Sequence, residues 1–176
     1  MFGKITAQKM LGGLEGQLGE DDYTEPLNIL VDSAKKNNTF NFFGSIAFRN
    51  QLKDRFKVRK EIYKLVKEKD LPQPADPIFV TGLPRSGTTF LFNLLSQDHN
   101  HRSPLYWEIM NPLPIAKTSQ QKKWRQNKIN FQLKFARTII PKLRAMHHIR
   151  GETPEECMLI ATMNVRSIVY LCMADV

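Results

Sequence analysis

Hydrophobic residues in the first 70 positions recur at the spacing of an α-helix. Phe48, Leu52 and Phe56 are each four residues apart, and Lys and Arg residues occupy many of the positions between them. The apolar side chains then share one helix face and the charges the other, so the pattern predicts one long helix or two over residues 45–69. Before it the pattern is weaker, with at most a short helix near residues 4–14.

Another helix is expected between these two. Pro26 suits the first helical turn, where its missing N–H would have no intrahelical acceptor, and Asn37-Asn38 would end the helix. Residues 71–77 then read Leu-Pro-Gln-Pro-Ala-Asp-Pro, and three prolines exclude a helix and favour an extended linker. We therefore expect a helical lead-in over residues 1–70, a linker over 71–77 and a second domain over 78–176.

The second domain opens with the pattern of a strand, a loop and a helix. Residues 78–95 read IFVTGLPRSGTTFLFNLL: four apolar or β-branched residues, a glycine-containing loop, and an apolar helix that is expected to run to about Gln97. A second short strand is predicted at residues 103–108, which would put Glu108 at the sheet edge where the loop opens. The fold class is then α/β, a parallel sheet of few strands with helices, preceded by the helical segment.

Two capping boxes predict the later helices. Thr118 with Gln121 would start a long helix, and Thr153 with Glu156 would start another with Pro154 at its first position. The second helix is expected to continue towards the last residue of the chain.

Charge adds a further feature to the first of these helices. The chain carries 26 Lys and Arg against 17 Asp and Glu, a net charge of +9. Ten of the basic residues, and no acidic ones, lie in one stretch: Lys117, Lys122, Lys123, Arg125, Lys128, Lys134, Arg137, Lys142, Arg144 and Arg150. Such a stretch is a solvated helix face or attracts nucleic acid, an anionic membrane or a polyanionic small molecule. Few aromatic residues are interleaved with these charges, which does not favour nucleic acid.

The remaining composition indicates a protein of the cytoplasm. No run approaches the roughly 18 apolar residues of a membrane span, and the N-terminus MFGKITAQKM lacks the core of a signal peptide. Two cysteines, Cys157 and Cys172, have no metal-ligand spacing and are expected to be buried thiols in a reducing compartment. The sequence indicates no metal site and no oligomeric state.

The loop has the spacing of a phosphate-binding loop. Gly82 and Gly87 are separated by four residues and followed by two hydroxyl residues, Thr88 and Thr89. Glycines let successive N–H groups point into one hollow, to which the helix adds its positive end. Thr88 stands where nucleotide triphosphatases have a lysine, and the cation is instead Arg85. A nucleotide triphosphatase or kinase is therefore the weaker alternative, also because no apolar strand ends in an Asp for Mg²⁺.

Three segments resemble the PAPS-dependent sulfotransferases of the bacterial type, where PAPS is 3′-phosphoadenosine 5′-phosphosulfate. They read GLPRSGTTFLFNLLSQD, PLYWEIMNP and HHIRGETPEEC, and the resemblance runs from about residue 45 to residue 170. It implies PAPS as co-substrate, no metal, and sulfuryl transfer to a hydroxyl or amine of a small-molecule or glycan acceptor. It also implies that the loop holds the 5′-phosphosulfate through Gly82, Leu83, Pro84, Arg85, Ser86, Gly87, Thr88 and Thr89.

The resemblance also implies catalytic residues. Arg85 would stabilise charge on the bridging oxygen as the sulfuryl group departs. Two residues are candidates for the base that accepts the proton of the acceptor: Glu108, where related sulfotransferases place an acidic base, and His147, ahead of Pro-Glu-Glu-Cys. Structural roles stand beside these: a carboxylate paired with a nearby Arg or Lys for Glu108, and a histidine near a helix end for His147.

Some parts of the family pattern are missing. The Arg and Ser residues that grip the 3′-phosphate of PAPS, and the later strands, do not occur before Val176. The alternative expectation is therefore a truncated, catalytically inactive sulfotransferase fragment with an incomplete sheet. A module that binds nucleic acid through its basic helix is the last alternative.

Overall fold

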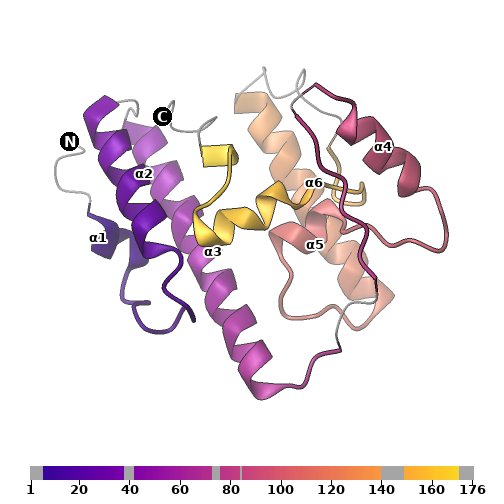
Figure 1. Cartoon of the computed structure of the whole chain (residues 1–176), viewed down its shortest axis with the longest axis horizontal. Coiled ribbons are helices and arrows are strands. Elements are labelled where there is room, and N and C mark those ends of the chain that lie inside the picture. The colour runs from indigo at the N-terminus through magenta and orange to yellow at the C-terminus, as the bar shows by residue number, and fades with distance from the viewer. Residues whose placement is uncertain (1–5, 38–41, 73–75, 84, 140–148, 171–176) are drawn as a thin grey trace. The chain divides into compact units, whose positions relative to one another are not determined.

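The computed structural model describes residues 6–37, 42–72, 76–83, 85–139 and 149–170, and this part of the chain is helical (Figure 1). The chain divides into two units, Met1–Leu71 with Met158–Val176, and Pro72–Cys157. The elements are α1 (Ala7–Leu11), α2 (Thr24–Asn37), α3 (Phe42–Glu68), α4 (Thr88–Leu95), α5 (Tyr106–Met110), α6 (Ser119–Ile139) and the short 3₁₀ turns η2 (Cys157–Leu159) and η3 (Ala161–Asn164).

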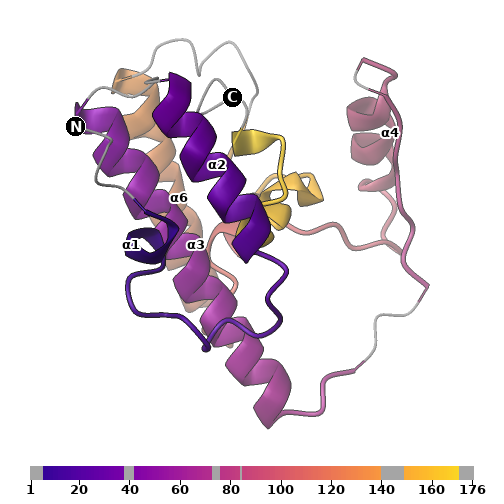
Figure 2. The same ribbon diagram turned by 60° about the vertical axis from the view of Figure 1, so that its left-hand side comes forward.

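The first unit is built on α3, which α1 and η3 contact and beside which α2 lies (Figures 1 and 2). The predicted helical pattern forms one continuous helix rather than two. The short α1 is defined by its ends: the Thr6 hydroxyl accepts the backbone N–H of Lys9 at 3.3 Å, and Gly12 ends the helix with φ 63°. A positive φ of this kind costs glycine little, because it has no Cβ.

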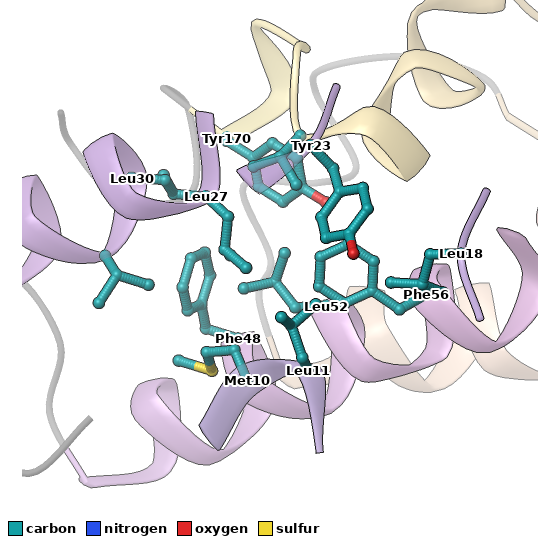
Figure 3. Close-up of a cluster of buried hydrophobic side chains, with 12 residues drawn as sticks. Met10, Leu11, Leu18, Tyr23, Leu27, Leu30, Phe48, Leu52, Phe56 and Tyr170 are labelled. Atoms are coloured by element: carbon teal, nitrogen blue, oxygen red, sulfur yellow. The ribbon is translucent and has the colours of Figure 1, made fainter. Parts of the chain in front are cut away.

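The core of the first unit lies between these helices (Figure 3). Phe48, Leu52 and Phe56, four residues apart on α3, are fully buried, as their spacing predicts. Tyr170, from the C-terminal part of the chain, completes this core: its ring lies edge-on to Phe48 at 6.3 Å, and its hydroxyl donates to the carbonyl of Thr162 at 2.8 Å. Residues that the sequence analysis assigned to the second domain therefore pack in the first unit.

One guanidinium joins three segments of the first unit. Arg59 of α3 donates to the carbonyls of Leu18 (2.6 Å) and Glu20 (2.7 Å), to the Asp22 carboxylate (2.5 Å) and to the Asn164 side chain (2.7 Å). It also lies 4.9 Å from the centre of the Tyr23 ring. These bonds hold the loop before α2 and the turn η3 on α3.

The second unit is organised by α6 and α5, which contact each other. The predicted capping box starts α6: the Thr118 hydroxyl accepts the N–H of Gln121 at 3.2 Å, and the Gln121 side chain accepts the N–H of Thr118 at 3.4 Å. Buried Gly151 lies against α6, because its N–H donates to the Asn130 side chain at 2.7 Å.

The predicted parallel sheet does not appear among the described residues. Residues 77–82 pair with no strand in the described part of the chain, and the described β-pairing is an isolated bridge between Leu105 and Pro154. The prediction of a strand at 103–108 is wrong in its second half, where α5 begins at Tyr106. The Glu108 carboxylate accepts the N–H of Leu105 at 3.0 Å, which satisfies a donor at the helix start and favours this turn.

The predicted helix from Thr153 is also wrong. The Thr153 hydroxyl accepts the N–H of Arg150 instead of an N–H of its own helix, and the backbone N–H of Glu155 donates to the Pro104 carbonyl at 3.0 Å. The N–H of Glu156 donates to the Glu155 side chain at 3.2 Å and not to Thr153, so the predicted capping box is not formed, and among the described residues the 3₁₀ turns η2 and η3 follow. Cys157, predicted to be buried, is exposed, and Cys172 lies outside the described residues.

The helix α4 ends at Leu95, two residues before the predicted end. No helix in the described part of the chain has the length and apolar character needed to cross a membrane.

Candidate functional site

The glycine loop forms a tight turn that leads into α4. The N–H of Ser86 donates to the carbonyl of Leu83 at 3.2 Å, and Arg85 and Gly87 have φ of 70° and 87°. Gly87 is the N-cap of α4, a position whose positive φ favours glycine. The predicted loop and helix start are therefore present, while Pro84 lies outside the described residues.

Gly82 is required by a close approach within this loop. A Cβ atom on Gly82 would lie 2.7 Å from the Ser86 hydroxyl oxygen and 2.9 Å from the Thr88 methyl carbon. The structure thus brings together three of the residues expected to bind phosphosulfate. The absence of a side chain at Gly82 is what lets Ser86 and Thr88 fold over the backbone.

The start of α4 offers hydrogen-bond donors. Within the described chain no side chain caps this helix start, and the first N–H groups of any helix lack intrahelical acceptors. These groups and the helix dipole favour an anion at this end. Arg85, exposed and without an ion pair among the described residues, adds a positive charge to the same loop.

The segment that carries the loop is apolar and exposed. None of the α4 side chains is buried, and Phe79 and Phe90 are 83% and 75% exposed. The extended residues before the loop run beside α4 in both views (Figures 1 and 2). The apolar residues that predicted a strand and a helix therefore lie without the cover that such residues usually have.

A carboxylate that the sequence analysis assigned to a helix cap contacts the loop. The Thr89 hydroxyl donates to Oε1 of Glu156 at 2.7 Å, across 67 positions of sequence. Glu156 is half-buried and follows a segment that is anchored to α5. The backbone N–H of Trp107 donates to the Gly151 carbonyl, and the backbone N–H of Tyr106 donates to the Thr153 carbonyl. The capping pattern concealed this role, because it gave Glu156 a local explanation.

Glu108 lies in α5 and is held by two donors. Besides the N–H of Leu105, its carboxylate accepts a hydrogen bond from the Arg102 guanidinium at 2.7 Å. The structural role considered for this residue, pairing with a nearby basic side chain, is thus observed. A catalytic role for Glu108 stays a prediction.

Glu108 also lines a hollow of about 350 Å³. Arg102, Ser103, Trp107 and Lys122 share its wall, which is therefore polar and basic. The Trp107 indole N–H is buried and has no hydrogen-bond partner within the described part of the chain.

The other predicted base, His147, lies outside the described residues, so its catalytic role stays a prediction. His101 is paired with Asp98 at 3.0 Å in an exposed turn. The hydrogen bond from the backbone N–H of Asn100 holds the pKa of Asp98 below its usual value.

Comparison with solved structures shows the fold to which this arrangement belongs. The chain is similar to the crystal structure of sulfotransferase STF1 from Mycobacterium tuberculosis H37Rv, with a TM-score of 0.64, 24% identity and coverage of 93% of this chain. It is also similar to sulfotransferase STF9 from Mycobacterium avium, with a TM-score of 0.67, 23% identity and coverage of 97%. The match covers 46% of each of those chains, so this chain spans about half their length.

The family follows from the sequence itself. A family model described as the sulfotransferase family matches residues 77–176, which include the loop, α5, α6 and the Glu156 segment. The chain therefore belongs to the sulfotransferase family, as its resemblance predicted. Comparison with curated proteins gives no match.

Proposed function

We propose that residues 82–89 bind the 5′-phosphosulfate of PAPS and that this chain serves sulfuryl transfer to a hydroxyl or amine of a small-molecule or glycan acceptor. The observation that carries this proposal is the loop geometry: Ser86 and Thr88 fold over Gly82, and Gly87 presents the start of α4. Membership of the sulfotransferase family supports it.

The hydrogen-bond donors of the loop fit a phosphosulfate group. Phosphate and sulfate oxygens only accept hydrogen bonds, and the loop offers backbone N–H groups, the hydroxyls of Ser86 and Thr88, and the Arg85 guanidinium. Thr89 differs from them, because its hydroxyl already donates to Glu156. The part of Thr89 in PAPS binding therefore differs from that of residues 82–88.

In the reaction, the acceptor oxygen or nitrogen forms a bond to sulfur while the bond from sulfur to the bridging oxygen breaks. Negative charge then develops on the bridging oxygen, which stays with the adenosine bisphosphate product. Arg85 and the N–H groups of the loop stabilise this charge electrostatically. The proton of the acceptor passes to a base.

Glu108 and His147 stay the two proposed bases. The polar hollow beside Glu108 supports an acceptor group there, and the Arg102 pair would keep its carboxylate oriented. His147 has the chemistry of a base near neutral pH. Because the chain spans about half of the similar solved structures, turnover, the 3′-phosphate site and the acceptor pocket all belong to the proposal. A non-catalytic chain that binds PAPS is the alternative.

Two measurements on the same variant test the proposal. In Arg85→Ala, transfer of label from PAPS to acceptors should fall about 10²- to 10³-fold, the loss typical of removing one preorganised donor. Calorimetric titration with 3′,5′-adenosine bisphosphate measures binding separately from turnover. Arg49→Ala, which removes an exposed arginine of α3 in the other unit, is the matched control.

Turnover in Arg85→Ala equal to that of the wild type would refute the role of Arg85. Binding of PAPS without any turnover by the wild type would instead support the non-catalytic alternative. If neither PAPS nor the bisphosphate binds, the proposed function is wrong.

A further inference from the structure

The carboxylate of Glu156 places a negative charge beside a loop that is expected to bind an anion. Its Oε1 accepts the Thr89 hydroxyl at 2.7 Å. Among the ion pairs formed by the described residues, none includes Glu156. A carboxylate at this place repels any bound anion, and it repels a doubly charged anion more than a singly charged one.

The backbone before Glu156 is held by elements outside the loop. The bridge between Leu105 and Pro154 and the hydrogen bond from the N–H of Glu155 to the Pro104 carbonyl fix this backbone beside the start of α5. The charge is therefore presented to Thr89 by the scaffold of the second unit. The repulsion between this carboxylate and a bound anion grows with the charge of the anion.

We propose that Glu156 is a specificity-determining residue that disfavours a terminal phosphoryl group relative to a terminal sulfuryl group. This inference rests on the proposed binding of PAPS by the loop. A sulfate ester carries one negative charge, whereas a terminal phosphate approaches two at neutral pH because its second pKa is about 6. The additional charge is repelled by the Glu156 carboxylate, and such a repulsive element disfavours one ligand relative to the other.

The direction of the Thr89 hydrogen bond acts in the same sense. An ionised carboxylate only accepts hydrogen bonds, so the single hydroxyl proton of Thr89 points at Glu156. Thr89 then offers its lone pairs, and no proton, to the ligand. A doubly charged phosphate, which binds hydrogen-bond donors more strongly than a sulfate does, loses more from the missing donor.

The test compares two ligands that differ only in the terminal group. Calorimetry measures the Kd of PAPS and of 3′-phosphoadenosine 5′-diphosphate with the wild-type protein and with Glu156→Gln. The ratio of the two Kd values should shift towards the phosphate ligand by on the order of tenfold in Glu156→Gln, since one charge interaction is removed at a partly exposed site. Glu152→Gln is the control, because Glu152 bonds to Asn130 of α6 at 3.0 Å rather than to the loop.

A ratio unchanged in Glu156→Gln would overturn the inference while leaving PAPS binding intact. Glu156→Asp keeps the charge and should keep the ratio within about threefold of the wild type; a shift as large as that of Glu156→Gln would also overturn it. Glu156 is only half-buried, and an isosteric Gln retains an acceptor for Thr89, so Glu156→Gln should fold. If the wild type binds neither ligand, the proposed function fails and this inference fails with it.

Discussion

Removing the guanidinium of Arg59 should destabilise the first unit strongly. In Arg59→Met the apolar stem of the side chain stays, while hydrogen bonds to Leu18, Glu20, Asp22 and Asn164 are lost. The loop before α2 and the turn η3 would then lose their shared attachment to α3. The perturbation is thus confined to one charged group and its acceptors.

The magnitude follows from burial and from the number of bonds. The side chains of Arg59 and Asp22 are 12% and 31% exposed, so this pair is worth more than a surface ion pair and less than a fully buried one. Hydrogen bonds to a charged group contribute about 1.5–3 kcal/mol each, but water reaches part of the freed acceptors, and removing one partner of a buried ion pair costs about 3–5 kcal/mol. We expect a net loss of about 3 kcal/mol in the free energy of unfolding.

Urea unfolding followed by circular dichroism measures this loss. With a slope of about 2 kcal/mol per molar urea, the midpoint should fall by about 1.5 M. Lys57→Met is the control: Lys57 pairs with Asp54 at 3.3 Å, but the side chains are 67% and 63% exposed, so the loss should stay below about 0.5 kcal/mol. If Arg59→Met is as stable as Lys57→Met, with the same dependence of unfolding free energy on urea, the stabilising role of the Arg59 hydrogen bonds is refuted.

Two further variants test the core and the loop. Burial raises the pKa of Tyr170 to about 12, so its contribution to stability is complete below the unfolded value of about 10 and is lost as the pH rises through 12. Between about pH 10 and 12 the unfolding free energy of the wild type should therefore fall by about 2 kcal/mol more than that of Tyr170→Phe, as measured by urea unfolding at each pH. The same dependence of unfolding free energy on pH in both proteins would contradict this. In Gly82→Ala the new Cβ would lie 2.7 Å from Ser86 Oγ and 2.9 Å from a Thr88 carbon. The affinity for PAPS should fall about tenfold or more while the exposed loop costs less than about 1 kcal/mol of stability, and an unchanged Kd would contradict the role of this loop.

The sequence predicted those features that depend on neighbouring residues. Spacing of four residues along α3 put Phe48, Leu52 and Phe56 on one buried face. Thr118 and Gln121 form the capping box that starts α6. The loop resemblance led to the sulfotransferase family, which the family match over residues 77–176 confirms.

Features that depend on distant residues could not be predicted in this way. The Thr153 pattern satisfied the rule for a capping box, but Glu155 gives its backbone N–H to the carbonyl of Pro104, far away in sequence. The contact of Glu156 with Thr89 and the four bonds of Arg59 likewise cross long sequence separations. Polar side chains with several possible partners carry no periodicity that would indicate which partner they choose.

The predicted strand at residues 103–108 failed for a related reason. Side chains such as Tyr106 and Trp107 favour strands, but a strand also needs a neighbour along its length. The bridge between Leu105 and Pro154 provides one pair of residues, after which the Glu108 carboxylate satisfies the start of α5. Local hydrogen bonding therefore decided this segment.

The helix α4 has a thermodynamic consequence for ligand binding. With none of its side chains buried, α4 is held mainly by its own backbone hydrogen bonds, and a helix of eight residues is marginal on that basis. The fraction of molecules in which its first turn is formed then multiplies the intrinsic affinity for an anion. Any polypeptide that covers Phe79 and Phe90 should raise this fraction and tighten anion binding without touching the anion. By the same linkage, a bound anion should strengthen the association of that polypeptide to an equal degree.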